Sequence, residues 1–279
     1  MRRRIKGCLL RGGMRLCAAL TCLLLLFLIG YLLCQGLPGI TWKFLTSQTS
    51  YIQNSIGILP NILNTLYLIF VSMLVVIPLG IGAAVYLTEY ASHQRLVRAI
   101  SFAVETLTGI PSIIFGLVGM LFFIQLLGLR QGILAGGLTL AIMVLPTVIS
   151  NTKESLLSVP QAYREGALAL GSGKWHMVRT VVLPNAMDGI LTGCLLAVGR
   201  ITGESAALLF TAGFGLKLLD FATALQSSSA TLTVALYVYA SEEGKYDVAF
   251  SIAVILMVVT LLINLSAEIM AKRLKRKKG

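Results

Sequence analysis

Arg200 and Glu204 stand four positions apart in an apolar stretch that reads AVGRITGESAALLFTAG. On a helix this spacing places both side chains on one face, one turn apart. A guanidinium is a planar fork of N–H donors that suits an oxyanion, and a neighbouring carboxylate can accept a hydrogen bond from an oxyanion that still carries a proton. The pair therefore indicates a path for a small oxyanion. The alternative is that the two charges neutralise each other and only orient the helix.

The stretch around this pair, from Gly189 to Phe210, is apolar and long enough to cross a membrane as a helix, because about 20 mostly apolar residues span the hydrocarbon core. Arg200 would lie near the middle of that crossing. An arginine at that depth costs roughly 2.5 to 3.5 kcal/mol on the insertion scale, so its side chain should face a partner or an aqueous cavity.

The composition of the whole chain requires a membrane. Of its 279 residues 57% are hydrophobic and 12% are charged, and the mean hydropathy is +0.87. Soluble domains are about 45 to 50% apolar and about 25% charged, so a water-soluble globule is excluded. We predict an all-α polytopic membrane protein with about six transmembrane helices. The predicted spans run approximately from Leu16 to Leu33, Ile62 to Leu87, Leu107 to Leu127, Ile133 to Ile149, Gly189 to Phe210 and Val248 to Met270.

The basic residues predict the orientation, because cytoplasmic loops of membrane proteins carry an excess of Lys and Arg. With the N-terminus in the cytoplasm, the inner segments receive Arg2, Arg3, Arg4, Lys6, Arg11, Arg15, Arg95, Arg98, Lys153, Arg164, Lys174, Arg179, Lys272, Arg273, Lys275, Arg276, Lys277 and Lys278. The outer segments receive Lys43, Arg130, Lys217 and Lys245. Both termini should therefore be cytoplasmic, with a basic arm over 1–15, a transmembrane domain over 16–270 and a basic tail over 271–279.

The formal net charge of +12 then reflects topology and contact with anionic lipid headgroups, and no nucleic-acid partner is expected. The first span could instead be a cleaved signal sequence. We favour an uncleaved helix, because its apolar stretch exceeds the 7 to 15 residues of a signal core.

The cytoplasmic segment over about 152–185 should form two helices. Ser158 and Gln161 fit a capping box that begins the first helix, and Gly171 is placed to end it in a left-handed conformation. A second helix from Lys174 to Val182 would end at Pro184. The residues alone leave open whether this helix-turn-helix rests among lipid headgroups or contacts a partner protein.

A resemblance favours the partner protein. The segment resembles the E-A-A-x3-G-x9-I-x-L-P loop of ABC importer permeases through Glu165, Gly166, Ala167, Gly171, Val181, Leu183 and Pro184. Gly166 replaces the first Ala of that pattern and Val181 replaces the Ile. The resemblance implies that this short helix docks in a cleft of a cytosolic ATPase and carries its closure to the membrane helices, with Glu165 as a polar docking contact and Gly171 as the turn.

Nucleotide chemistry is not expected on this chain. The string Gly171, Ser172, Gly173, Lys174 would need Gly and Ser or Thr at the flanking positions to be a P-loop, but Leu168 and Trp175 stand there. ATP and Mg²⁺ should therefore be bound by the partner ATPase, and this chain should bind no cofactor and no metal.

A closer resemblance extends from Pro78 to the last span. PLGIGAAVYLTEY, IPSIIFGL, YREGALALGSGKWHMV and GRITGESAALLFTA look like the PstA-type membrane subunit of bacterial phosphate ABC importers. The resemblance implies the type I importer permease architecture, the bacterial inner membrane, a second permease subunit of similar fold, two ATPase subunits and an external phosphate-binding protein. The external segment over about 211–246 gives no local match.

Three other functions are weighed against this one. A permease for another small oxyanion is compatible with Arg200 and Glu204. An ion-coupled carrier or channel could also use an intramembrane Arg and Glu, but it would have no use for an ATPase-docking loop. An intramembrane enzyme would need a second acid, a nucleophile with a base or a metal cluster within the spans, and Glu204 is the only acid that we place deep in one. No catalytic residues are therefore predicted.

Overall fold

Helices dominate the computed structural model, which describes residues 2–50 and 55–276. In the first half of the chain the elements are α1 (Arg2–Gly36), η1 (Leu37–Gly39), α2 (Trp42–Thr46), β1 (Gln48–Ser50), β2 (Ser55–Ile58), α3 (Leu59–Val85), η2 (Tyr86–Tyr90), α4 (Gln94–Thr108), α5 (Ser112–Gly119) and η3 (Met120–Leu126). In the second half they are α6 (Ile133–Leu157), α7 (Gln161–Ala169), α8 (Lys174–Met177), η4 (Val178–Val182), α9 (Leu183–Thr202), α10 (Ala206–Thr211), α11 (Phe221–Leu225), α12 (Leu232–Tyr237), η5 (Val238–Glu242) and α13 (Tyr246–Arg276). Lys277 and Lys278 of the predicted tail lie outside the described residues.

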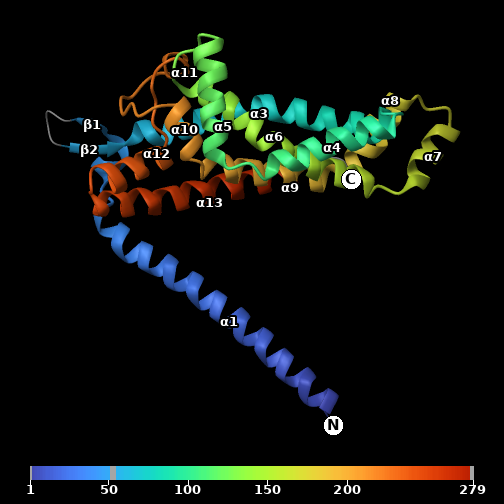
Figure 1. Ribbon diagram of the computed structural model, residues 1–279, viewed down its shortest axis with the longest axis horizontal. Helices are drawn as coiled ribbons and strands as arrows, with labels where there is room; N and C mark the ends of the chain where they lie inside the picture. The colour runs from blue at the N-terminus through green and yellow to red at the C-terminus, as the bar shows by residue number, and fades with distance from the viewer. Residues whose placement is uncertain (1, 51–54, 277–279) are drawn as a thin grey trace.

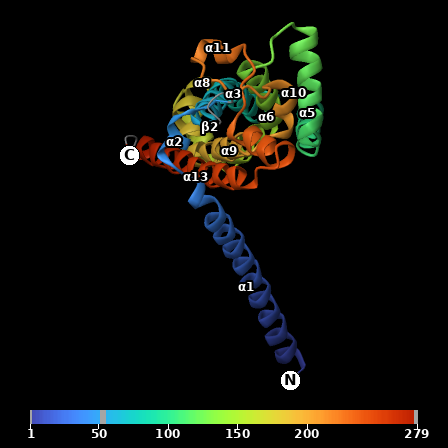
Figure 2. The same ribbon diagram turned by 90° about the vertical axis from the view of Figure 1, so that its left-hand side faces the viewer.

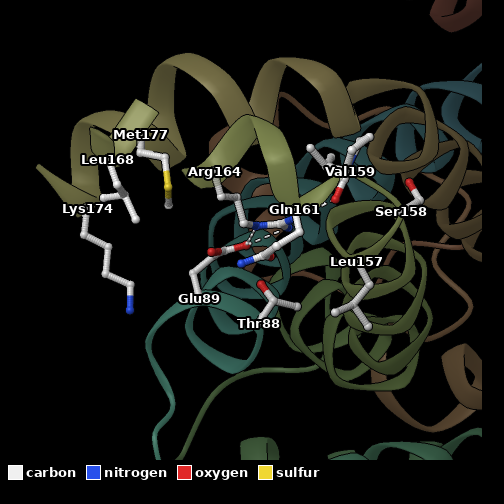
Figure 3. Close-up of a pocket in the computed structure, with 11 residues that line it drawn as sticks. Thr88, Glu89, Leu157, Ser158, Val159, Gln161, Arg164, Leu168, Lys174 and Met177 are labelled. Carbon is white, nitrogen blue, oxygen red and sulfur yellow. Dashed lines mark hydrogen bonds and ion pairs between the residues drawn. The ribbon is translucent and has the colours of Figure 1, made fainter. Parts of the chain in front are cut away.

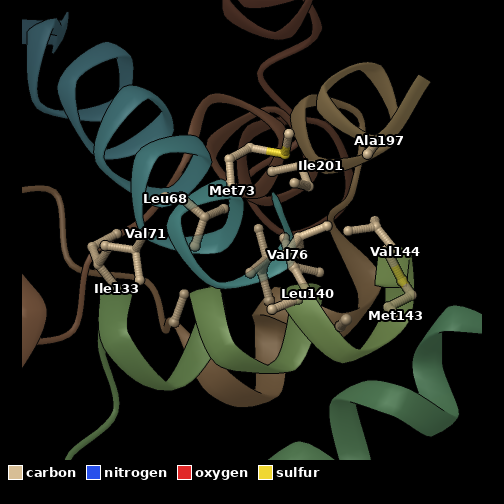
Figure 4. Close-up of a cluster of buried hydrophobic side chains, with 14 of the residues drawn as sticks. Leu68, Val71, Met73, Val76, Ile133, Leu140, Met143, Val144, Ala197 and Ile201 are labelled. Atoms are coloured by element: carbon tan, nitrogen blue, oxygen red, sulfur yellow. The ribbon is translucent and has the colours of Figure 1, made fainter. Parts of the chain in front are cut away.

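The long helices α3, α6, α9 and α13 form an elongated bundle (Figures 1 and 2). We call the end that carries α7 and α8 the elbow end, and the end that carries β1, β2 and α12 the hairpin end. The core lies where α3, α6 and α9 meet, and Figure 4 shows Val76, Leu140 and Ile201 pointing into it from these three helices. Outward side chains such as Phe70 and Leu74 are exposed. An apolar outer surface over helices whose backbone bonds are satisfied internally fits a lipid environment.

The first helix, α1, stands apart from this bundle in both views. It is joined to the start of α13 near its own C-terminal end, where Ser251 Oγ donates a hydrogen bond to the carbonyl oxygen of Gly36 at 3.0 Å. The ring of Tyr31 packs edge-on against that of Phe250, with 5.8 Å between the centroids. Side chains earlier in α1, from Met14 to Ile29, are largely exposed.

A buried polar cluster fixes the hairpin end. The side-chain amides of Asn61 and Asn64 in α3 both donate to the carbonyl oxygen of Ala230, at 3.0 and 3.1 Å. Thr65 Oγ1 accepts the backbone N–H of Leu232 at 3.0 Å. Unpaired polar groups are expensive away from water, so these bonds hold the segment that precedes α12 firmly against α3. The two-stranded hairpin beside it pairs Gln48 with Ile58 and Ser50 with Ser55 in antiparallel register.

The prediction of about six transmembrane helices is confirmed. Within the described residues, five helices are long and apolar enough to cross a membrane, and a bent pair can supply a sixth span. That pair corrects the third predicted span, Leu107 to Leu127. It consists of α4 and of α5 continued by η3, bent by 103° at a short break. Pro111 lies in the break, and a proline disfavours the helical conformation of the residue before it.

The fifth predicted span, Gly189 to Phe210, is also corrected at both ends. The helical run begins at Lys174, passes through the π-helical turn η4 and ends at Thr202. Pro184 therefore does not end the second helix of the predicted helix-turn-helix. It lies in the first turn of α9, where a missing N–H is tolerated. At the other end Gly203 caps α9, and α10 starts as a separate short helix at Ala206.

We expect Gly116→Ala to destabilise the bundle, because α5 crosses α10 at that glycine. A Cβ atom there would lie 2.6 Å from the Cα atom of Ala207 and 2.9 Å from its carbonyl oxygen. Backbone atoms cannot turn away, so the free energy of unfolding should fall by about 1 to 3 kcal/mol. Thermal unfolding in detergent measures this loss. Gly82→Ala in α3 is the control, since a Cβ there meets nothing within 4 Å. Equal melting temperatures for the two variants would contradict the close crossing.

Candidate functional site

The elbow is the segment that follows α6 and comprises α7, α8 and η4. The predicted capping box is absent from it. Ser158 follows α6, and its hydroxyl donates to the carbonyl oxygen of Ser155 at 2.8 Å. The next helix, α7, starts at Gln161 with Pro160 as its N-cap and without a side-chain capping bond. The prediction was wrong because α6 extends about two turns beyond the apolar stretch and takes Ser158 into its own C-terminal turn.

The predicted turn at Gly171 is confirmed. Gly171 has a φ of +81°, and its N–H donates to the carbonyl oxygen of Leu168 at 3.0 Å. The N–H of Ser172 donates to the carbonyl oxygen of Ala167 at 3.1 Å. This pair of bonds is the glycine-dependent Schellman arrangement that closes a helix. It turns the chain from α7 back into α8.

The predicted ATPase-coupling residues divide into two groups by exposure. Glu165, Gly166 and Gly171 are exposed on α7 and its turn. Ala167 and Leu183 pack against a buried apolar cluster formed by Ala84, Val85, Leu156, Val159, Met177, Val178, Val182, Ala186 and Ile190. Val181 and Pro184 are half-buried in the helical run that leads into α9. The elbow thus presents an exposed helix whose other side is anchored on the bundle.

Sequence reasoning missed the strongest polar contact of the elbow, the buried ion pair between Arg164 and Glu89 (Figure 3). Arg164 Nε and Nη2 lie 3.1 and 3.0 Å from Glu89 Oε1. The two side chains are 11% and 6% exposed. They line a pocket of about 510 Å³ between α7, η2 and the end of α6. The residues stand 75 positions apart, so the spacing within either segment could not indicate that they meet.

The structure does not pair Arg200 with Glu204. Arg200 lies in the last turn of α9 and is half-buried, whereas Glu204 lies in the break after it. Glu204 Oε1 accepts the N–H of Ala207 at 3.1 Å, and its carbonyl oxygen accepts the hydroxyl of Thr233 at 2.7 Å. The side chain of Arg200 makes no hydrogen bond or ion pair within the part of the chain that the structure describes.

One expectation is therefore corrected, because Arg200 is not in the middle of an unbroken span. The alternative, that the two charges neutralise each other, is not supported, since the structure forms no ion pair between them. The fixed 3.6-residue period would place both side chains on one face, but the helix ends at Thr202 before it reaches Glu204. What remains is a half-buried guanidinium in an apolar bundle with its five donors available. The carboxylate of Glu204 lies in the break that follows α9, where the N–H of Ala207 holds it.

The segment that follows α10 leads into α11, near the hairpin end of the bundle. Asp220 caps α11, and both the hydroxyl and the N–H of Thr223 donate to its carboxylate, at 2.6 and 3.4 Å. These bonds hold the pKa of the Asp220 carboxyl below its ordinary value. The cap therefore stabilises the folded state at pH values above the pKa that this carboxyl has in the unfolded chain. This stabilisation is lost as the pH falls through the lower pKa of the carboxyl in the folded state.

Comparisons with known proteins cover most of the chain. Residues 76–278 match the family model of the binding-protein-dependent transport system inner membrane component. The chain is 39% identical over 221 residues to a probable ABC transporter permease protein, YqgI, of Bacillus subtilis, covering 79% of this chain and 75% of that protein. It is 34% identical over 246 residues to the phosphate transport system permease protein PstA of Xylella fastidiosa, covering 88% and 85% of the two chains.

A solved structure shares the fold over nearly the full length. A chain of the bacterial alginate ABC transporter, solved in complex with an alginate pentasaccharide-bound periplasmic protein, superposes with a TM-score of 0.69. The two chains are 20% identical, and the match covers 98% of this chain and 97% of that one. This likeness shows that the two chains share a fold.

Proposed function

Because the chain belongs to the family of binding-protein-dependent transport system inner membrane components, we propose that it is the permease subunit of an ATP-driven importer for inorganic phosphate. The observation that carries this proposal is the half-buried Arg200, whose guanidinium has no partner within the described chain. An unpaired cation is costly in an apolar bundle unless it faces water, a partner or an anion. The 34% identity to a phosphate permease over 88% of the chain supports phosphate as that anion.

Arg200 and Glu204 divide the recognition of phosphate between them. The guanidinium donates to two phosphate oxygens as a fork. Glu204 has one oxygen engaged with the N–H of Ala207, and its other oxygen can accept a hydrogen bond from the phosphate hydroxyl. Sulfate at neutral pH carries no proton to donate, so the same carboxylate would repel it. Recognition by this pair therefore favours a protonated oxyanion.

The elbow end lies in the cytoplasm in this proposal. In Figure 1, α13 runs from the hairpin end toward the elbow end, so its last turns lie nearer to α7 than its first. The basic residues of the elbow, Lys174 and Arg179 among them, lie on that side too, as cytoplasmic segments require. The hairpin end then faces the outside, and both termini are cytoplasmic.

The remaining subunits supply what this chain lacks. A second permease subunit completes the translocation path, and an extracytoplasmic binding protein delivers phosphate to the hairpin end. Two cytoplasmic ATPase subunits bind ATP and Mg²⁺, and each grips one elbow. This chain binds neither ATP nor metal. On this chain α7 offers an exposed face for docking.

The test is uptake of radiolabelled phosphate in cells that lack this subunit and in cells that regain it. We expect the regained subunit to restore uptake, with excess unlabelled sulfate or molybdate competing poorly. Competition by molybdate or sulfate as strong as that by phosphate would instead assign the path to another oxyanion. Uptake that is equal with and without the subunit would contradict the proposed function.

A further inference from the structure

Arg164 is bonded to three separate parts of the chain at once. Its Nε and Nη2 atoms hold Glu89 Oε1 at 3.1 and 3.0 Å. Nη1 donates to the carbonyl oxygen of Val159 at 2.6 Å, and Nη2 donates to that of Leu156 at 2.7 Å. Leu156 lies in the last turn of α6, and its carbonyl oxygen also accepts the N–H of Val159 at 3.3 Å. One guanidinium on α7 thus ties that helix to the end of α6 and to η2, which continues α3.

The rest of α7 is weakly attached. No residue of α7 is fully buried, and most of its side chains are exposed. Besides Arg164, only Ala167 among its described residues packs against the apolar cluster of the elbow. In Figure 3 the side chain of Arg164 points from α7 toward Glu89. The orientation of α7 on the bundle therefore depends on this one side chain more than on packing.

The ends that Arg164 holds belong to helices that form the core. The helices α3 and α6 pack together along the bundle, and α6 also packs against α9, which carries Arg200. A displacement applied to α7 through Arg164 would therefore move α3 and α6 together. Along the chain, α7 is connected to α9 through the turn at Gly171 and the helical run from Lys174.

We propose that Arg164 and Glu89 form a clamp that makes α7 a single mechanical unit with the ends of α3 and α6. The clamp delivers the ATPase stroke to both helices at once. Arg164 is a positioning residue in this scheme, since it acts through helix ends and touches no substrate. The inference rests on the proposed function of α7 as the segment that an ATPase grips.

A simpler role can be separated from the clamp. If Arg164 only capped the end of α6 through Leu156 and Val159, Glu89 would be dispensable. Glu89→Ala leaves both carbonyl bonds in place and removes only the link to η2. It is therefore the decisive variant, and it also avoids a buried unpaired carboxylate, which Arg164→Gln would leave at position 89.

The experiment uses the assembled importer in proteoliposomes, with phosphate on the binding-protein side and ATP on the ATPase side. Hydrogen exchange of the amides of residues 161–169 and the number of phosphate ions moved per ATP hydrolysed are both measured. In Glu89→Ala and Arg164→Gln we expect exchange in α7 to rise about tenfold and uptake per ATP to fall about tenfold, the loss expected for a hydrogen bond to a charged group. The matched control is Glu243→Gln, which removes the exposed ion pair with Lys245 at the hairpin end. We expect no change in it.

Wild-type exchange in Glu89→Ala would overturn the clamp, and so would raised exchange with unchanged uptake per ATP. The exchange measurement needs no substrate, so it separates the two proposals. If the wild-type assembly moved no phosphate while Glu89→Ala still raised exchange in α7, the proposed substrate would fail and the clamp itself would stand.

Discussion

Arg200→Gln should lower phosphate uptake by about 100-fold while leaving the protein folded and assembled. The glutamine side chain keeps hydrogen-bonding groups but loses the charge and the fork of donors that binds two oxygens of one anion. Because Arg200 makes no hydrogen bond or ion pair to other described residues, the substitution removes no internal polar contact. The measurement is the initial rate of labelled phosphate uptake, normalised to the amount of subunit in the membrane.

The control for this variant is Arg98→Gln. Arg98 is also an arginine, but it is exposed on α4 and bonds within its own helix, with Nε 3.4 Å from the carbonyl oxygen of Gln94. Uptake should be unchanged in it. Wild-type rates in Arg200→Gln would make Arg200 a structural charge and remove it from the translocation path.

Glu165→Lys should separate ATP hydrolysis from uptake. We expect hydrolysis by the assembled importer to continue while phosphate uptake falls to background, because a lysine at this position would place a positive charge against the ATPase surface that docks a carboxylate. Glu165 is exposed and its side chain is bonded to nothing else in the described chain, so the reversal acts only through a partner. Its neighbour Arg164 is instead engaged in the ion pair with Glu89.

Both rates are measured on the same membranes, beside immunodetection of the subunits. Glu154→Lys is the matched variant, because Glu154 is an exposed acid at the same end of the bundle but lies on α6. It should behave as wild type. A Glu165→Lys importer that takes up phosphate normally would refute the docking role of this residue.

The approximate positions of the spans were predictable, because hydropathy depends only on local composition. The bends and breaks within the spans were not predictable. A run of apolar residues gives no direction, so the window over Leu107 to Leu127 does not reveal that the chain turns by 103° at Pro111. In the same way, the apolar residues of the fifth predicted span do not indicate that a π-helical turn carries the helix from Lys174 past Pro184. Such features depend on how a segment packs against its neighbours, and α5 is placed by its contacts with α6 and α10.

In the elbow too, some features could be predicted from the local sequence and others could not. Gly171 was predictable, because one residue needs a conformation that glycine alone adopts readily. The meeting of Arg164 with Glu89 was not, since it depends on where two distant segments end. At the other site the residue types of Arg200 and Glu204 signalled a special position. Their mutual pairing failed, because Thr233 and the N–H of Ala207 hold Glu204 in a break that no periodicity could reveal.

The attachment of α1 near its C-terminal end bears on how such proteins are made. The helix is apolar enough to leave the translocation machinery and enter the bilayer before the bundle exists. The family match begins at residue 76, after this helix has ended. Because α1 contacts the bundle near its own C-terminal end, most of its exposed apolar surface is left for lipid.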